Sequence, residues 1–170
     1  VVFGKASGFN AATALSTLDG NNGFRLDGGT THILEQSGFS VSGAGDVNGD
    51  GYDDVIVGAP AAASYYGDSI DGFSYVVLGK ASGFSAALDL SKSDFGMSGG
   101  YESHLGLSVS GAGDINGDGF DDLIIGTNGA MYSSYAVFGE ASGFKFGFGV
   151  IGDTGYRSVS DAGDVNGDGI

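Results

Sequence analysis

The sequence has no cysteine and no tryptophan, one proline, and only 6 basic residues among 170. The absence of cysteine excludes disulfide bonds. Because 21 acidic residues bring the net charge to −15, nucleic acids and anionic membranes are disfavoured as partners, since both are bound through basic patches. No apolar run reaches the roughly 18 residues of a membrane-spanning helix, so no membrane insertion is expected, and no N-terminal signal pattern is visible.

The sequence also offers little for catalysis. The two histidines, His32 and His104, do not occupy matching repeat positions, and neither has a spaced serine or carboxylate partner. We expect both in loops or at strand edges. There is no phosphate-binding loop and no zinc pattern, so we expect a protein that is not an enzyme; a carboxylate pair of the kind used in glycoside hydrolysis stays open.

The sequence is rich in glycine, aromatic residues and acidic residues. It contains 35 Gly, 12 Phe and 8 Tyr, and its apolar fraction is 41%. That apolar content is sufficient for a folded core and is not typical of a disordered acidic tail.

About half of the acidic residues lie in or beside one repeated motif. It begins at Asp46, returns at Asp114 and starts again at Asp164, with oxygen-bearing side chains at loop positions 1, 3, 5 and 9 and glycine at positions 4 and 6. Calcium takes about 6–8 oxygen ligands, and a tight glycine turn lets alternate residues face one centre. The expected ligands are three sets: Asp46, Asn48, Asp50, Asp54 and the Tyr52 carbonyl; Asp114, Asn116, Asp118, Asp122 and the Phe120 carbonyl; and the incomplete set Asp164, Asn166 and Asp168.

Two other interpretations of this motif fit the sequence less well. Asn-Gly and Asp-Gly form surface turns without any metal, but three copies with the same carboxylate spacing favour a cation site. An EF-hand needs a glutamate at position 12, where this chain has Val57 and Ile125. The apolar, β-branched residues that follow each loop indicate a strand, so the motif is expected to lie inside a β-hairpin.

A second repeat sets the strand pattern. Val-Val-Phe-Gly-Lys-Ala-Ser-Gly-Phe at residue 1 recurs with small changes at residues 76 and 136. The phenylalanines that end it, Phe9, Phe84 and Phe144, are expected to pack in a core or between sheets. No helical periodicity is present. Strands are expected at residues 1–4, 23–27, 39–42, 54–58, 74–79, 95–98, 107–110, 122–126, 134–139 and 146–151.

These features together resemble FG-GAP repeats, which occur in the β-propeller of integrin α-subunits and in many bacterial secreted proteins. The Phe-Gly element is Phe3-Gly4 and Phe138-Gly139, with Leu78-Gly79 as a conservative departure, and Gly58-Ala59-Pro60 matches Gly-Ala-Pro. Gly126-Thr127-Asn128 does not match it. The resemblance implies an all-β fold of four-stranded antiparallel β-propeller-type blades, with Ca²⁺ in the loops named above.

The repeats divide the chain into four parts. Residues 1–38 are expected to supply outer strands of a preceding blade, 39–104 and 105–155 to form two blades with calcium loops, and 156–170 to start a further blade. Since propellers close with about 4–8 blades, we expect these residues to be part of a longer chain.

Three functions fit this sequence. The first is a calcium-stabilised extracellular or cell-surface module, secreted and of bacterial type, for adhesion or for binding protein or glycan. The second is a structural repeat of an extracellular filament or surface array, with copies of itself as partners. The third is a non-catalytic propeller of a secreted enzyme.

Tyr65, Tyr66 and Tyr132 lie in loops rich in Tyr, Ser and Gly and are candidates for a ligand surface, although packing on a neighbouring blade is the alternative.

Overall fold

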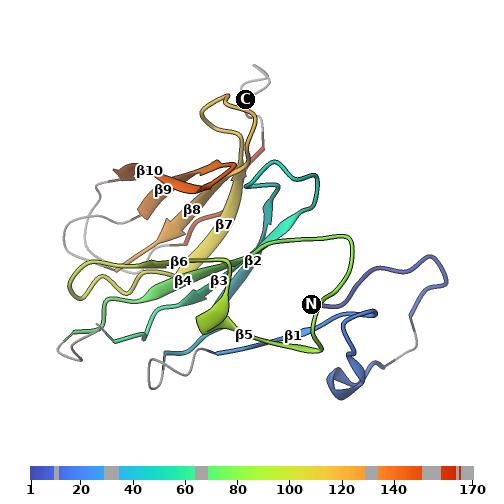
Figure 1. The fold of residues 1–170 in the computed structure, drawn as a ribbon. Helices are drawn as coiled ribbons and strands as arrows, with labels where there is room; N and C mark the ends of the chain where they lie inside the picture. The colour runs from blue at the N-terminus through green and yellow to red at the C-terminus, as the bar shows by residue number, and fades with distance from the viewer. Residues whose placement is uncertain are drawn as a thin grey trace.

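Two four-stranded antiparallel sheets and one short parallel strand pair make up the fold (Figure 1). The structure, a computed structural model, describes residues 1–9, 12–28, 35–63, 69–128, 134–150, 158–163 and 165. Within these ranges the only helical segments are two three-residue 3-10 turns, so the chain is all-β, as predicted. No helix in the described part is long and apolar enough to cross a membrane.

The first sheet has the strand order β2-β3-β4-β6. Its strands are β2 (Ser40–Gly45), β3 (Asp54–Ala59), β4 (Phe73–Val77) and β6 (Phe95–Ser98). All neighbours are antiparallel. The four strands expected from the sequence are therefore confirmed, with bounds shifted by a few residues at some ends.

The second sheet repeats this order with β7-β8-β9-β10. Its strands are β7 (Ser108–Gly113), β8 (Asp122–Gly126), β9 (Ser134–Glu140) and β10 (Gly143–Val150). The β10 strand begins earlier than the expected residue 146, because a hairpin with β9 already pairs Gly143 with Glu140. Each sheet thus has the strand number and direction expected of a propeller-type blade.

The main core lies between the facing sheets. Alternation along β3 and β8 points Ile56 and Leu123 into it. Both side chains are fully buried, and Phe144 of β10 meets Phe95 of β6 edge-on at 5.1 Å between ring centres. The other buried members are Ala44, Val47, Val76, Leu105, Val109, Ile125 and Val137.

A second core covers the opposite face of the first sheet. Val57 and Tyr75 point toward it, so β3 is buried on both faces, as its continuous apolar sequence predicts. The covering layer comes from β1 (Arg25–Asp27) and β5 (Ala87–Asp89), which pair in parallel, and from the 3-10 turn η2 (Leu90–Lys92). The two strands come from distant parts of the sequence, and no local pattern predicted their pairing.

The N-terminal segment departs from expectation in two ways. Residues 1–4 do not form a strand, because the only ladder contact there is the isolated bridge between Val2 and Gly23. Phe9 is 57% exposed and not in a core, and Lys5 lies over its ring at 5.3 Å. A 3-10 turn, η1 (Leu15–Thr17), follows.

The first strands of the two sheets lie side by side. A Cβ on Gly111 of β7 would come within 2.9 Å of the Gly43 carbonyl oxygen of β2, so only small residues fit here. The Ser40 hydroxyl donates to the Gly106 carbonyl at 2.8 Å. Residues 158–163 form no strand but lie beside β7, since the Val159 amide donates to the Ser108 hydroxyl at 3.2 Å. The two repeats therefore place their first strands, β2 and β7, next to one another.

Candidate metal centre

Each aspartate loop connects the first two strands of a sheet. Residues 46–53 join β2 to β3, and residues 114–121 join β7 to β8. The sequence prediction of a loop inside a β-hairpin is confirmed. In each case a β-bulge precedes the loop, at Gly45 and at Gly113, where φ is +71° and +65°. Glycine suits this left-handed backbone, which turns the chain out of the ladder and into the loop.

Side-chain oxygens of the first loop fold inward over its own backbone. Asp46 accepts the Asp50 amide at 3.0 Å through Oδ1 and the Gly51 amide at 2.8 Å through Oδ2. The Asn48 Oδ1 atom accepts the Asp50 amide at 3.0 Å, and Asp50 Oδ1 accepts the Tyr52 amide at 3.0 Å. Loop positions 1, 3 and 5 therefore all face the same turn of backbone.

The aspartate at position 9 is placed differently. Asp54 is 1% exposed. Its Oδ2 accepts the Val47 amide at 3.0 Å, and its Oδ1 accepts the Gly79 amide just after β4 at 2.7 Å. One buried carboxylate thus joins the start of the loop to the third strand of the sheet.

The second loop reproduces this arrangement. Asp114 accepts the amides of Asp118 and Gly119 at 3.0 and 2.7 Å. Asp122 is buried, and it accepts the amides of Ile115 and Gly139, both at 3.0 Å. The same bonds at the same loop positions in two hairpins show that the motif encodes one defined local structure.

Burial and charge act together on the position-9 carboxyls. Burial raises the pKa of Asp54 from 3.8 to about 6; the hydrogen bonds from Gly79 and Val47 oppose the rise, and the charges of Asp50 and Asp46 add to it. Burial also raises the pKa of Asp122, with a smaller contribution from the charges of Asp118 and Asp114. Each buried carboxylate therefore lies in a negative field that a cation would relieve.

The donor chemistry of both loops fits a hard cation. Asp, Asn and backbone carbonyl groups supply only oxygen, which Ca²⁺ and Mg²⁺ prefer. A carboxylate oxygen that accepts one amide keeps a lone pair for a metal. Among the described residues, however, no three acidic or histidine side chains converge as they stand into a group that could hold an ion.

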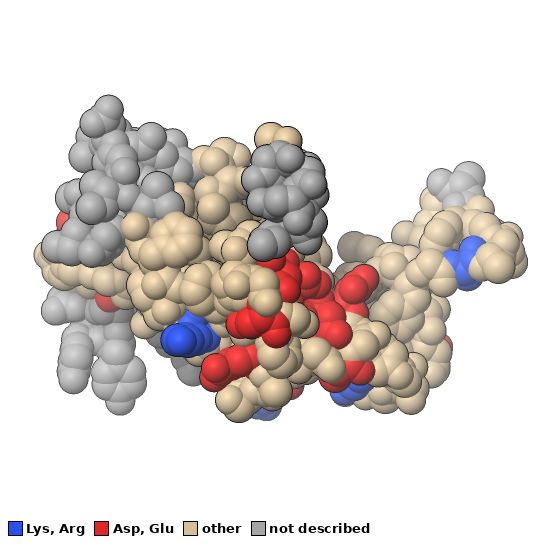
Figure 2. Space-filling view, turned by 90° about the horizontal axis from the view of Figure 1, so that it is seen from above, with Lys and Arg blue, Asp and Glu red and all other residues tan. Residues whose placement is uncertain are grey.

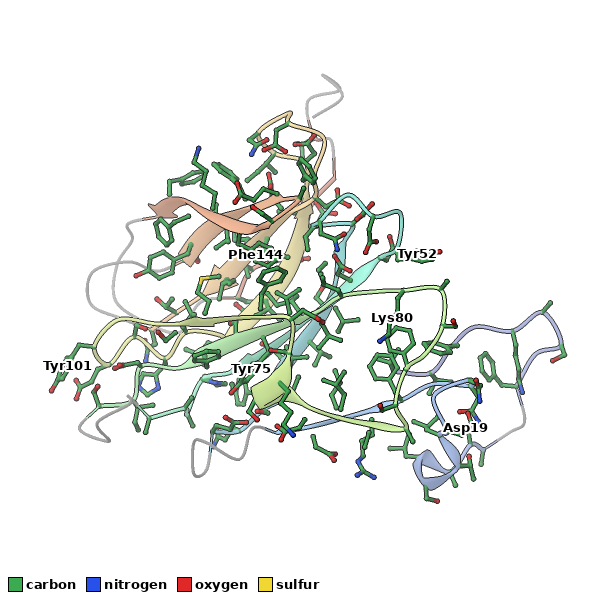
Figure 3. All side chains as sticks on the ribbon, in the orientation of Figure 1. Asp19, Tyr52, Tyr75, Lys80, Tyr101 and Phe144 are labelled. Carbon is green, nitrogen blue, oxygen red and sulfur yellow. The ribbon has the colours of Figure 1, made fainter. Side chains whose placement is uncertain are left out.

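Both loops lie on the same side of the molecule. Figure 2 shows acidic side chains gathered into a band on this face, with Lys and Arg at its margins. The two loops touch, because the Asp46 amide donates to the Asp121 carboxylate at 2.8 Å. Tyr52 projects outward from the first loop and is exposed (Figure 3).

Several residues singled out from the sequence fall outside the described part of the chain. They are the third-loop residues Asp164, Asn166 and Asp168, the tyrosines Tyr65, Tyr66 and Tyr132, and His32. His104 is described. Its Nδ1 lies 3.2 Å from the Pro60 carbonyl oxygen in a partly buried position, so it contacts the turn that follows β3.

Two polar contacts that join distant parts of the fold were not predicted from the sequence. One is the bond between Asp46 and Asp121, which joins the two hairpins. The other is a buried bond in which the Tyr75 hydroxyl donates to Glu35 at 2.9 Å. The partners lie 75 and 40 residues apart. The only sequence signal for the first was the repeated Asp-Asp pair at loop positions 8 and 9.

Comparison with known proteins agrees with this geometry. The family model described as FG-GAP repeat matches residues 37–77 and 105–143, and each match contains one complete aspartate loop. The chain carries two FG-GAP repeats. The first matched range runs from just before β2 to the end of β4, and the second runs from just before β7 to the start of β10.

Integrin α-subunits are among the proteins similar to these repeats. Integrin alpha-PS5 of Drosophila melanogaster is 38% identical over 109 residues, which are 59% of this chain and 10% of that protein. Integrin alpha-IIb of Mus musculus is 36% identical over 109 residues, 64% of this chain and 10% of that protein. Integrin alpha pat-2 of Caenorhabditis elegans is 36% identical over 89 residues, 52% of this chain and 7% of that protein. The chain thus spans about a tenth or less of these relatives.

Proposed function

We propose that this chain is a calcium-stabilised, non-catalytic, extracellular FG-GAP module that serves adhesion through protein or glycan binding. The observation that carries the proposal is the duplicated loop. Two hairpins, one in each sheet, present the same all-oxygen donor set, and the position-9 carboxylate of each is buried beside two further acids. A structure that concentrates negative charge in this way is stabilised by a bound dication.

Side chains at loop positions 1, 3, 5 and 9 would hold the ion, with the carbonyl at position 7 as a further ligand. In the first loop these are Asp46, Asn48, Asp50, Asp54 and Tyr52, and in the second Asp114, Asn116, Asp118, Asp122 and Phe120. Because the position-9 carboxylate already bonds to the amide after the third strand, an ion on it would be connected to the sheet as well as to the loop. The ion would neutralise the loop carboxylates, so we assign it a structural task.

Thermal unfolding in calcium and in chelator tests the calcium part of the proposal. A ligand present at about 100 times its Kd stabilises the folded state by about 2.7 kcal/mol, so millimolar Ca²⁺ should raise the Tm by several degrees. Asp50→Ala and Asp118→Ala should each remove about half of that shift, and the double variant all of it. Lys92→Ala, an exposed change outside both loops, is the control. Equal Tm values in calcium and chelator would refute the calcium proposal.

The adhesive and extracellular parts rest on the similarity to integrin α-subunits. Tyr65, Tyr66 and Tyr132 remain the proposed ligand surface. Binding of the protein to immobilised extracellular-matrix proteins and to a glycan array, in calcium and in chelator, tests both parts. Replacing the three tyrosines by alanine should abolish a positive signal, whereas Tyr101→Ala, at an exposed tyrosine outside these loops, should not.

One observation favours a second function, as a repeat in a filament or surface array. The face of the second sheet that points away from the first is partly open, and Phe148 there is 52% exposed. Exposed apolar surface of this kind promotes association between copies. Light scattering should then show polymers in calcium that dissociate in chelator; a constant monomer mass under both conditions would remove this alternative.

A further inference from the structure

Asp121, at position 8 of the second loop, contacts the first loop instead of its own. Its carboxylate Oδ2 accepts the Asp46 amide at 2.8 Å, and its own amide donates to the Asp46 carbonyl at 3.2 Å. The peptide groups on both sides of Asp46 are therefore bonded to one residue of the neighbouring hairpin. Asp46 is also the position-1 residue whose carboxylate folds over the first loop.

The residues around Asp121 strengthen this contact. A Cβ on Gly49 would lie 2.7 Å from the ring of Phe120, and a Cβ on Gly139 would lie 2.4 Å from the Val47 carbonyl oxygen. Val47 itself is fully buried. The first loop is thus held against the second sheet by side-chain and backbone contacts along its first half.

The corresponding position in the other loop is free of such contacts within the described residues. Asp53 occupies position 8 of the first loop, is exposed, and makes no side-chain hydrogen bond to any described residue. Gly113 precedes the second loop as Gly45 precedes the first. A Cβ on Gly45 would meet the Asp121 carboxylate at 2.1 Å, whereas one on Gly113 would meet nothing described within 4 Å.

We propose that the position-8 aspartate is a clamp between adjacent blades, and that Asp121 raises the cation affinity of the first loop by fixing the backbone at Asp46. The inference rests on the proposed calcium function. Its physical basis is preorganisation, because a ligand that is already held in place loses less conformational freedom when the ion binds. By the same chemistry, Asp53 fits the position-1 amide of a preceding FG-GAP repeat.

The test compares Asp121→Ala and Asp121→Asn with Asp53→Ala. Calcium titration followed by NMR distinguishes the loops, because the Gly51 and Gly119 amides bond to Asp46 and Asp114, respectively. Amide hydrogen exchange at Asp46, measured in chelator, reports the clamp without any metal. Asp53→Ala removes one charge beside the first loop without removing a bond, so it controls for electrostatics.

In Asp121→Ala we expect exchange at Asp46 to rise about tenfold and calcium to bind the first loop about tenfold more weakly, as loss of one charge-assisted hydrogen bond implies. Asp121→Asn keeps an acceptor oxygen, so it should stay within about threefold of the wild type in both measurements. Asp53→Ala should leave both within about twofold. An unchanged Gly119 resonance in every variant shows that the second loop remains folded.

Unchanged exchange at Asp46 in Asp121→Ala would overturn the clamp. Faster exchange with unchanged calcium affinity would overturn the claim that Asp121 raises the calcium affinity of the first loop. Equal weakening by Asp53→Ala and Asp121→Ala would show that charge alone is responsible, and would also overturn the proposal. If the wild type binds no calcium, the proposed function fails and the affinity claim fails with it, while exchange in chelator still decides whether the clamp exists.

Discussion

Asp54 connects two parts of the first sheet, because each of its carboxylate oxygens accepts a backbone amide from beyond a different strand end. Asp50 is exposed and bonds only within its own loop. The same motif therefore contains one residue that holds the sheet together and others whose bonds remain local. Because Asp54 and Asp50 are both proposed cation ligands, substitutions are needed to distinguish their structural roles.

The structural roles of Asp54 and Asp50 should differ measurably in chelator, where no cation contributes to stability. There Asp54→Ala should lower the free energy of unfolding by about 2–4 kcal/mol, because it leaves two amides without an acceptor. Asp50→Ala should lower it by about 1 kcal/mol or less under the same conditions. Urea unfolding measures both. In calcium, both variants should lose the contribution of the first site. Equal losses in chelator would contradict the structural task assigned to Asp54.

Tyr75 provides a second test at a buried polar pair. Tyr75→Phe removes the hydroxyl that donates to Glu35, and we expect a loss of about 1–3 kcal/mol. Tyr101→Phe, at a tyrosine that is 74% exposed, should cost almost nothing.

The pair should also respond to pH. Burial and the bond to Glu35 raise the pKa of Tyr75 above its usual range, so the folded state favours the protonated phenol. The stabilisation is complete below about pH 10 and decreases above it, where the unfolded tyrosine ionises. The difference in stability between the wild type and Tyr75→Phe should therefore shrink above about pH 10. A constant difference from pH 7 to 11 would contradict this explanation.

Among the elements, the bulge that opens each loop combines backbone strain with contact between sheets. Gly45 and Gly113 have the same left-handed backbone, but only Gly45 faces Asp121. The pair is therefore a natural control for the contact between the hairpins.

Alanine at either bulge should cost about 1–2 kcal/mol for the positive φ alone. Gly45→Ala should cost about 1–3 kcal/mol more, because its methyl group would displace Asp121. Urea unfolding of the two variants in chelator gives the comparison. Equal destabilisation would mean that the hairpins do not touch as described.

Most individual elements could be predicted from the sequence, because each relies on local signals. The apolar run 54–58 and the glycine-aspartate loop before it fix β3 and its hairpin without reference to the rest of the chain. The β1 and β5 strands could not be paired this way, since Leu26 and its partner Leu88 lie far apart in the sequence and no local signal connects them. The same limit explains Phe9: its Ala-Ser-Gly-Phe context matches that of Phe84, but only Phe84 has Phe24 to stack on, at 4.6 Å.

Across the whole molecule, stability comes from two cores on either side of the first sheet. Phe144 lies between the two sheets (Figure 3), where its ring meets that of Phe95. Phe148 lies on the same strand but faces away from the first sheet. The sequence placed only Phe148 in the weak strand expected at residues 146–151, with Phe144 before it. The faces of the two rings could not be assigned from the sequence, because the bulge between Phe146 and Phe148 shifts the alternation.

Phe144→Ala should lower the free energy of unfolding by about 3–5 kcal/mol, because it removes a ring from between the sheets. Phe148→Ala should cost about 1 kcal/mol or less, since half of its surface is already in water. Circular dichroism during urea unfolding measures both. A larger effect at Phe148 would indicate that its face is covered in solution.

The small residues between β2 and β7 have a consequence for how such repeats diversify. Glycine, alanine and serine let backbone meet backbone, so the distance between neighbouring sheets does not depend on the size of any variable side chain. The connection from β3 to β4 spans residues 60–72, while that from β8 to β9 spans only 127–133, yet both sheets begin with Ser-Val-Ser-Gly-Ala-Gly. Insertions far from the aspartate loops thus leave the inner spacing intact, and those distal connections are natural places to graft new recognition sequences.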